Sequence, residues 1–144
     1  MVSALTEAGG PVALTTGLVG AGGFGKTMLA ERACQDRAVR RRFPGGVCWV
    51  TVGRELDGER LAQRISEAVW NLGGEGRTFA SLEEAGRALT AALAARSWML
   101  LVADDVWTSG QLAPFVTAGQ AGRLLVTTRR PAVLAGTAAR RVEV

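Results

Sequence analysis

One glycine-rich stretch constrains the fold of this chain more than any other feature. It reads GLVGAGGFGKTML at residues 17–29 and overlaps the end of an apolar, β-branched run at 12–19. The residues after it, from Lys26 to about Arg37, have the small and apolar side chains of a helix that packs closely on a sheet. A buried strand that passes through a glycine loop into a helix predicts a phosphate-binding α/β unit.

The glycine loop fits two phosphate-binding patterns at once. Gly20, Gly22 and Gly25 satisfy GxGxxG, the pattern of dinucleotide-binding domains. A dinucleotide domain has an acidic residue about 20 residues further on to bind the ribose. This chain has arginines at 40–42 there, and the first acid after the second predicted strand is Glu55. An arginine can bind the extra phosphate of NADP, so a dinucleotide domain stays open as an alternative.

The second pattern, GxxxxGK[ST], gives a task to every residue of the loop. The glycines, at positions 20, 22, 23 and 25, leave backbone N–H groups free to surround phosphates at a helix N-terminus. Lys26 would contact the β and γ phosphates, and the Thr27 hydroxyl would ligate magnesium. Lys26 is the only lysine among the 17 basic residues. We therefore favour a nucleoside-triphosphate site over a surface loop with an exposed lysine.

Strand and helix patterns alternate along the rest of the chain. The helical segments have amphipathic spacing, and a Ser81–Glu84 capping box precedes the second of them. The strands are apolar runs of the kind that parallel sheets bury on both faces. Expected strands are 12–19, 47–52, 98–103, 123–128 and 140–144; expected helices are 26–37, 58–72, 82–96, 109–117 and a short one within 131–138. This order predicts a three-layer α/β P-loop core with a mainly parallel, five-stranded sheet.

Two carboxylates follow the predicted strand 98–103. Asp104 is placed to hold a metal ion, as acids at the ends of buried strands do in triphosphate sites. Asp105 is a candidate general base or water-orienting group. Adjacent carboxylates repel each other, and a divalent cation would relieve that repulsion. Alternatively, the pair only ends the strand and caps the next turn.

The strand 123–128 ends in polar residues. Thr127 and Thr128 could offer hydroxyls to the γ-phosphate, and Arg129 could offer a guanidinium that senses hydrolysis. The alternative for Arg129 is an ordinary surface arginine in a loop.

Composition excludes several other functions. The chain has no histidine, so a Ser/His/Asp triad or a histidine-bearing zinc site cannot form within it. Cys34 and Cys48 lack metal-ligand or redox spacing, and we expect buried core thiols. The net charge of +4 is spread along the chain and predicts no nucleic-acid binding, and the arginines at 40–42 are interpreted as a solvated turn. The uncharged run at 8–25 is too rich in glycine for a membrane span, so we expect a cytoplasmic protein.

Four segments in order, GAGGFGKT, FPGGVCWVTV, LLVADDVW and RLLVTTR, resemble the signature blocks of the NB-ARC domain of STAND signalling ATPases. The resemblance covers roughly residues 12 to 130. It implies ATP or ADP with magnesium, slow hydrolysis and a switch between a closed and an open, assembling form. It also implies that the Thr127 strand lies between the loop strand and the Asp104 strand. By motif, Lys26 and Thr27 bind phosphate and magnesium, Asp104 binds the metal, Asp105 is the catalytic acid, and Arg129 senses the γ-phosphate.

The sequence departs from that family in two ways. Met28 stands where the family repeats threonine, a change that the retained Thr27 should tolerate. The family's C-terminal ARC and winged-helix modules, which close over the nucleotide, have no counterpart among the 144 residues. We therefore expect an N-terminal lead at 1–11 and a nucleotide-binding core at 12–144, taken from a longer parent that could supply regulatory domains or form a homo-oligomer. A free-standing P-loop ATPase, a small kinase and a nucleotide-free interaction domain remain alternatives.

Overall fold

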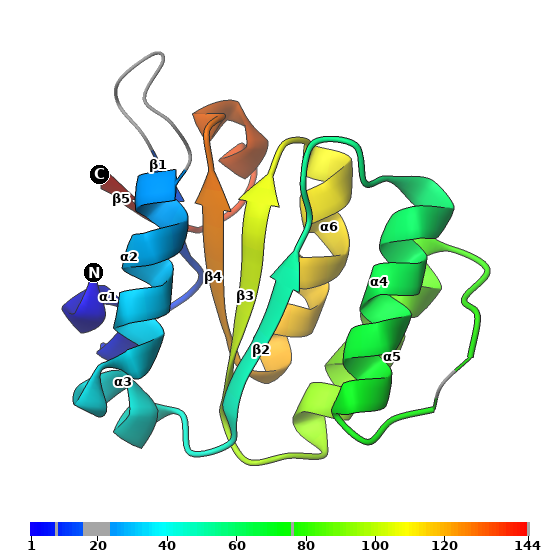
Figure 1. Cartoon of the computed structure of the whole chain (residues 1–144), viewed down its shortest axis with the longest axis horizontal. Coiled ribbons are helices and arrows are strands. Elements are labelled where there is room, and N and C mark those ends of the chain that lie inside the picture. Colours follow the sequence, from blue (N-terminus) through cyan, green and yellow to red (C-terminus); the bar gives the residue numbers. More distant parts are fainter. Residues whose placement is uncertain (8, 16–23, 76, 144) are drawn as a thin grey trace.

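The computed structural model describes residues 1–7, 9–15, 24–75 and 77–143 (Figure 1). Within them, one five-stranded sheet has the strand order β2-β3-β4-β1-β5, and every neighbouring pair is parallel. The strands are β1 (Val12–Thr15), β2 (Gly46–Thr51), β3 (Met99–Val106), β4 (Arg123–Thr128) and β5 (Arg140–Glu143). The predicted five-stranded α/β core is confirmed, and β4 lies between β1 and β3 as the resemblance implied.

Helices cover both faces of this sheet. One face carries α1 (Val2–Thr6), α2 (Phe24–Gln35) and α3 (Arg37–Arg42). The other carries α4 (Gly58–Asn71), α5 (Leu82–Ala94) and α6 (Ser109–Ala118), as Figure 1 shows to the right of the strands. Two short 3₁₀ turns flank β4, η1 (Gly119–Ala121) and η2 (Pro131–Leu134). The result is the expected three-layer arrangement.

The apolar strands supply both cores because successive side chains alternate between the faces. Leu100 and Val102 of β3 pack with α1, α2 and α3, whereas Leu101 and Ala103 pack with α4, α5 and α6. All four are fully buried. This two-sided burial is why the strand sequences show apolar runs without polar alternation.

The arginines at 40–42 do not form the expected turn. They are the last residues of α3, which begins after Asp36, whose side chain accepts a hydrogen bond from the Ala38 N–H at 2.8 Å. An acidic N-cap and basic residues in the last turn both favour a helix. Val39 anchors α3 in the core with 1% exposure. The sequence interpretation was wrong here because the cap was overlooked beside the charged run.

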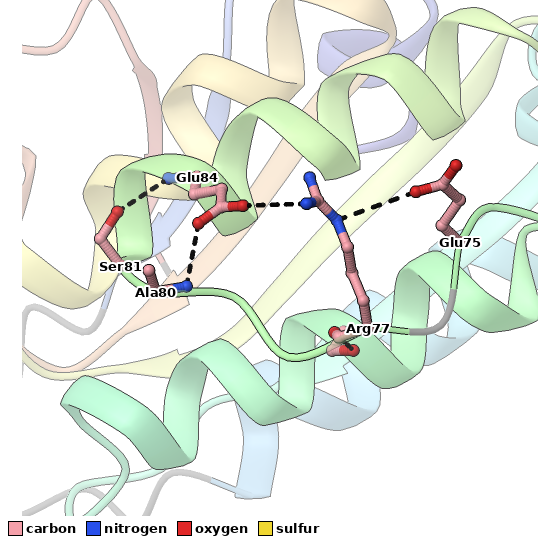
Figure 2. A network of polar contacts seen from close by, with 6 residues as sticks. Glu75, Arg77, Ala80, Ser81 and Glu84 are labelled. Carbon is pink, nitrogen blue, oxygen red and sulfur yellow. Dashed lines mark hydrogen bonds and ion pairs between the residues drawn. The ribbon is translucent and has the colours of Figure 1, made fainter.

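The segment between α4 and α5 is fixed by a polar network (Figure 2). Arg77 forms an ion pair with Glu84 at 3.2 Å, and Glu75 lies 3.9 Å from the Arg77 Nε. Ser81 caps α5 by accepting from the Glu84 N–H at 3.1 Å, as the capping box predicted. The Glu84 carboxylate accepts from the Ala80 N–H at 2.9 Å, one residue before the N-cap. The start of α5 is therefore held from both sides.

Burial keeps both thiols protonated. Cys48 is buried as expected, whereas Cys34 is only half-buried. Burial raises the pKa of each thiol to about 11, and neither cysteine is in a disulfide. Since the thiolate is the reactive form, these side chains are chemically quiet at neutral pH.

The N-terminal residues 1–11 were expected to be a lead that precedes the nucleotide-binding core. Ala4 and Leu5 of α1 are buried in the hydrophobic core, and the division into a lead and a core domain stays a prediction. Within the described part of the chain, no helix is both long and apolar enough to cross a membrane.

Candidate functional site

The carboxyl ends of β3 and β4 and the start of α2 meet at one edge of the sheet. In open parallel sheets this is the edge at which ligands bind. The β3–β4 register runs from Ala103 opposite Val126 to Val106 opposite Thr128, so β3 has one extra residue within this stretch. Asp105 takes up that irregularity with φ +60°, a left-handed conformation that aspartate tolerates better than most residues. Asp104 and Asp105 therefore lie where the regular pairing of β3 with β4 is interrupted, at the carboxyl edge of the sheet.

Thr27 and Asp104, the two predicted metal ligands, are in direct contact. The Thr27 hydroxyl donates toward the Asp104 carboxylate, with Oγ1 3.0 Å from Oδ1 and 3.2 Å from Oδ2. Asp104 is 4% exposed, so its side chain is almost enclosed by protein. The contact joins residues 77 positions apart, one at the start of α2 and the other near the end of β3.

Thr127 completes the arrangement around Asp104. Its hydroxyl donates to Asp104 Oδ1 at 2.5 Å and accepts from the Asp105 N–H at 2.8 Å. Thr127 and Thr128 are 1% and 0% exposed. The Thr128 hydroxyl donates to the Val106 carbonyl at 2.7 Å. Both hydroxyls thus form hydrogen bonds with other groups of the protein, whereas they were expected from the sequence to face a γ-phosphate.

Lys26 lies in the same neighbourhood as these carboxylates. It is 3% exposed, and burial lowers its pKa below the ordinary value. The charge of Arg129 lowers the pKa of Lys26 further, whereas Asp105 and Asp104 act in the opposite direction. A lysine that is buried near another cation is stabilised in its charged form by an anion.

Arg129 is exposed and extends over the indole of Trp107. Its guanidinium carbon is 5.6 Å from the ring centre, within cation–π distance. The charge of Arg129 also acts on Lys26, near the start of α2.

The glycines of the loop are only partly covered by the structure. Gly25 is the second residue of α2, and a Cβ added to it would meet no atom of the described residues within 4 Å. Gly20, Gly22 and Gly23 fall in the segment 16–23, outside the described residues. Their role in wrapping phosphates stays a prediction.

The donor set at this edge fits magnesium better than a transition metal. Thr27 and Asp104 offer only oxygen ligands, and Mg²⁺ binds few protein oxygens, completing its shell with water and phosphate oxygens. Over the described ranges, no three histidine, cysteine or acidic side chains gather as a complete metal cage. Thr27 and Asp104 are the residues that would hold Mg²⁺ together with a nucleotide.

A large groove lies elsewhere on the molecule. It has a volume of about 990 Å³ and is lined by α4 residues, including Trp70, and by 77–80. None of the residues around Asp104 lines it. Its chemistry offers no converging phosphate or metal ligands, so size alone does not identify the site.

Three residues at the sheet edge were not predicted. Arg54, Trp107 and Arg130 follow the ends of β2, β3 and β4, and the two arginine guanidiniums lie 5.3 and 5.4 Å from the Trp107 ring centre. Gln111, buried at 3% exposure, holds the loops that carry Arg54 and Trp107. The sequence could have identified these three residues by their position just after the strand ends, because such positions lie at the edge of the sheet where ligands bind.

Comparisons with known proteins show the family of the chain. The chain matches the NB-ARC domain over residues 1–143. It is 34% identical over 121 residues to apoptotic protease-activating factor 1 of Homo sapiens, covering 79% of this chain and 9% of that protein. It is 33% identical over 119 residues to the putative disease resistance RPP13-like protein 1 of Arabidopsis thaliana, covering 78% of this chain and 11% of that protein. The chain is also 31% identical over 121 residues to disease resistance protein RGA2 of Solanum bulbocastanum, covering 78% of this chain and 12% of that protein. The chain belongs to the NB-ARC family, the nucleotide-binding module of STAND-type signalling proteins.

Proposed function

We propose that this domain binds ATP or ADP with Mg²⁺ at the carboxyl edge of its sheet. The observation that carries the proposal is the convergence of Lys26, Thr27 and Asp104, which come from one loop-to-helix junction and one strand end. Lys26 would hold the β and γ phosphates, and Thr27 would give its hydroxyl oxygen to the metal. When bound, Mg²⁺ neutralises phosphate charge and orients the phosphate groups.

Asp105 is proposed as the group that orients or deprotonates the attacking water. Its main-chain N–H is fixed by Thr127, and its charge raises the pKa of Lys26, so the carboxylate is close enough to act on that lysine. Arg129 would stabilise the γ-phosphate. Slow hydrolysis by these groups would act as a switch, because ATP and ADP would favour different states of a larger protein.

The biological setting is proposed from the relatives. Their names describe disease resistance and the activation of an apoptotic protease, and the chain spans only 9 to 12% of the three proteins described above. We infer a cytoplasmic signalling protein in which further domains, or further copies of the chain, respond to the nucleotide state.

Calorimetric titration identifies the ligand. ADP and ATP should bind the wild-type chain, and Mg²⁺ should strengthen ATP binding. Asp104→Asn should retain metal-free binding and lose that strengthening, because an amide oxygen binds Mg²⁺ less well than a carboxylate. NADPH should not bind. Binding of NADPH without binding of ADP or ATP would replace this proposal with the dinucleotide-domain alternative.

A second experiment tests the role of Asp105. Asp105→Asn keeps the size of the side chain and is tolerated at φ +60°, so folding should be preserved. We expect ATP affinity within about twofold of wild type and loss of most hydrolysis, about 100-fold, because general-base contributions are of that order. Loss of binding in parallel with hydrolysis would assign Asp105 to ligand or metal binding instead.

A further inference from the structure

Three arginines from three loops surround one indole at the carboxyl edge. The guanidinium carbons of Arg54, Arg129 and Arg130 lie 5.3, 5.6 and 5.4 Å from the centre of the Trp107 ring. All three arginines are exposed, and none forms an ion pair with an acid in the part of the chain that the structure describes. The indole face attracts each cation and so offsets part of the repulsion between them. We refer to Arg54, Trp107, Arg129 and Arg130 as the arginine cluster.

A buried glutamine builds the first half of this cluster. The Gln111 amide nitrogen donates to the carbonyls of Gly53 and Leu56 at 2.9 and 2.7 Å, on either side of Arg54. Its amide oxygen accepts from the main-chain N–H of Trp107 at 2.8 Å. One side chain therefore holds the loop after β2 against the loop after β3, so Arg54 is brought to Trp107 by a fixed framework.

A buried threonine builds the second half. The Thr128 hydroxyl donates to the Val106 carbonyl at 2.7 Å and accepts from the Arg130 N–H at 3.0 Å. It thereby joins the residue before Trp107 to the loop that carries the last two arginines. The Trp107 Nε1 is itself buried without a hydrogen-bond partner among the described residues.

The arginine cluster lies beside the phosphate-binding residues. Asp105 precedes Trp107 by two residues, and its carbonyl accepts from the Gly53 N–H at 3.0 Å, next to Arg54. Both Asp105 and Arg129 act electrostatically on Lys26. The γ-phosphate, which Lys26 would hold together with Arg129, would therefore approach the cluster.

We propose that Arg54 and Arg130, organised by Trp107, form with Arg129 the part of the site that recognises the terminal phosphate of a nucleoside triphosphate. This inference rests on the proposed function and adds the residues that separate a triphosphate from a diphosphate. Arginine suits this task because its planar donors match phosphate oxygens. ADP, which lacks the terminal group, gains little from the cluster.

The test compares two double variants with the same change in charge. Arg54→Gln/Arg130→Gln removes the new contacts and keeps Arg129. Arg37→Gln/Arg87→Gln removes two exposed arginines whose side chains form no hydrogen bond, ion pair or ring contact among the described residues. Calorimetry measures the affinity for ADP and for the non-hydrolysable analogue AMP-PNP, both with Mg²⁺, after circular dichroism has shown that each variant is folded.

We expect the cluster variant to lose about tenfold in affinity for AMP-PNP, equivalent to about 1.4 kcal/mol, and to bind ADP within about twofold of wild type. The control variant should change neither affinity by more than about twofold, because distant surface charges are screened. An unchanged AMP-PNP affinity in the cluster variant, or an equal loss for both nucleotides, would overturn the inference and leave the proposed function intact. If the wild-type chain binds neither nucleotide, the proposed function itself fails.

Trp107 supplies an independent readout. AMP-PNP should change the fluorescence of the wild-type chain more than ADP does, and Trp107→Phe should remove that difference while keeping a ring for the arginines. The same difference in Trp107→Phe would show that the signal comes from Trp49, Trp70 or Trp98 and would contradict a terminal phosphate at the cluster.

Discussion

Asp104 is the residue around which the site is organised. Hydroxyls from Thr27 and Thr127 both donate to its carboxylate, and Thr127 also fixes the N–H of Asp105. Buried carboxylates need such donors because they have lost the hydrogen bonds of water. Thr127 is therefore a positioning residue for both acids.

Thr127→Val tests this role. Valine has nearly the same shape but leaves the Asp105 N–H unpaired and removes one donor from Asp104, so unfolding free energy should fall by about 1–3 kcal/mol. Thr117→Val is the matched control, because its hydroxyl donates to the Ala113 carbonyl on an exposed helix surface. The control should change stability by less than about 0.5 kcal/mol. Equal effects in urea denaturation would mean that Thr127 does not support the buried carboxylate.

Residue patterns predicted part of this arrangement of side chains directly. Lys26, Thr27 and Asp104 are each tied to a local signal, either the start of a helix or the end of a strand, and Thr27 and Asp104 do meet. The hydrogen-bond partners of the Thr127 hydroxyl were not predicted. The sequence Thr-Thr-Arg does not say whether a side chain faces a ligand or a neighbouring strand. Arg54 was missed for a related reason, since its contact with Trp107 exists only once two loops are held together.

At the scale of elements, the packing of α5 on α6 supports the face behind β3 and β4. Gly86 of α5 faces Pro114 of α6 so closely that an added Cβ would lie 3.1 Å from both the Cα and the Cβ of Pro114. Two helices that approach this closely need a residue without a side chain at the contact.

Gly86→Ala should therefore destabilise the fold by about 1–3 kcal/mol, because the helices must separate to admit a methyl group. Gly110→Ala is the matched control in α6, where the nearest atom to an added Cβ is the Thr108 Oγ1 at 3.9 Å. That change should be neutral or stabilising by up to about 1 kcal/mol, since alanine favours a helix. A thermal melt in which Gly86→Ala is as stable as wild type would show that α5 and α6 can move apart freely.

Most elements could be predicted because their signals are local. β4 was predicted at its observed residues, and α4 within one residue, since an apolar run and an amphipathic period mark them clearly. α3 was missed because its propensity is weak and its stability comes from the Asp36 cap and the burial of Val39.

At the scale of the whole molecule, strand order brings distant residues together. β1, whose strand precedes the glycine loop, pairs with β4, and β4 pairs with β3. Lys26, Asp104 and Arg129 thus converge although about 100 residues separate the first from the last. This long-range pairing cannot be obtained from any single sequence window. It was anticipated only through the order of the four family blocks.

The central claim is that this edge of the sheet binds nucleotide phosphates through Lys26, and calorimetry of Mg-ADP binding tests it most directly. Lys26→Ala should lower the affinity at least about tenfold, because it removes a buried charge that, under the proposed function, would contact the phosphates. Arg87→Ala, which removes an exposed charge of α5, should remain within about twofold of wild type. A folded Lys26→Ala variant that binds Mg-ADP as tightly as wild type would contradict the account.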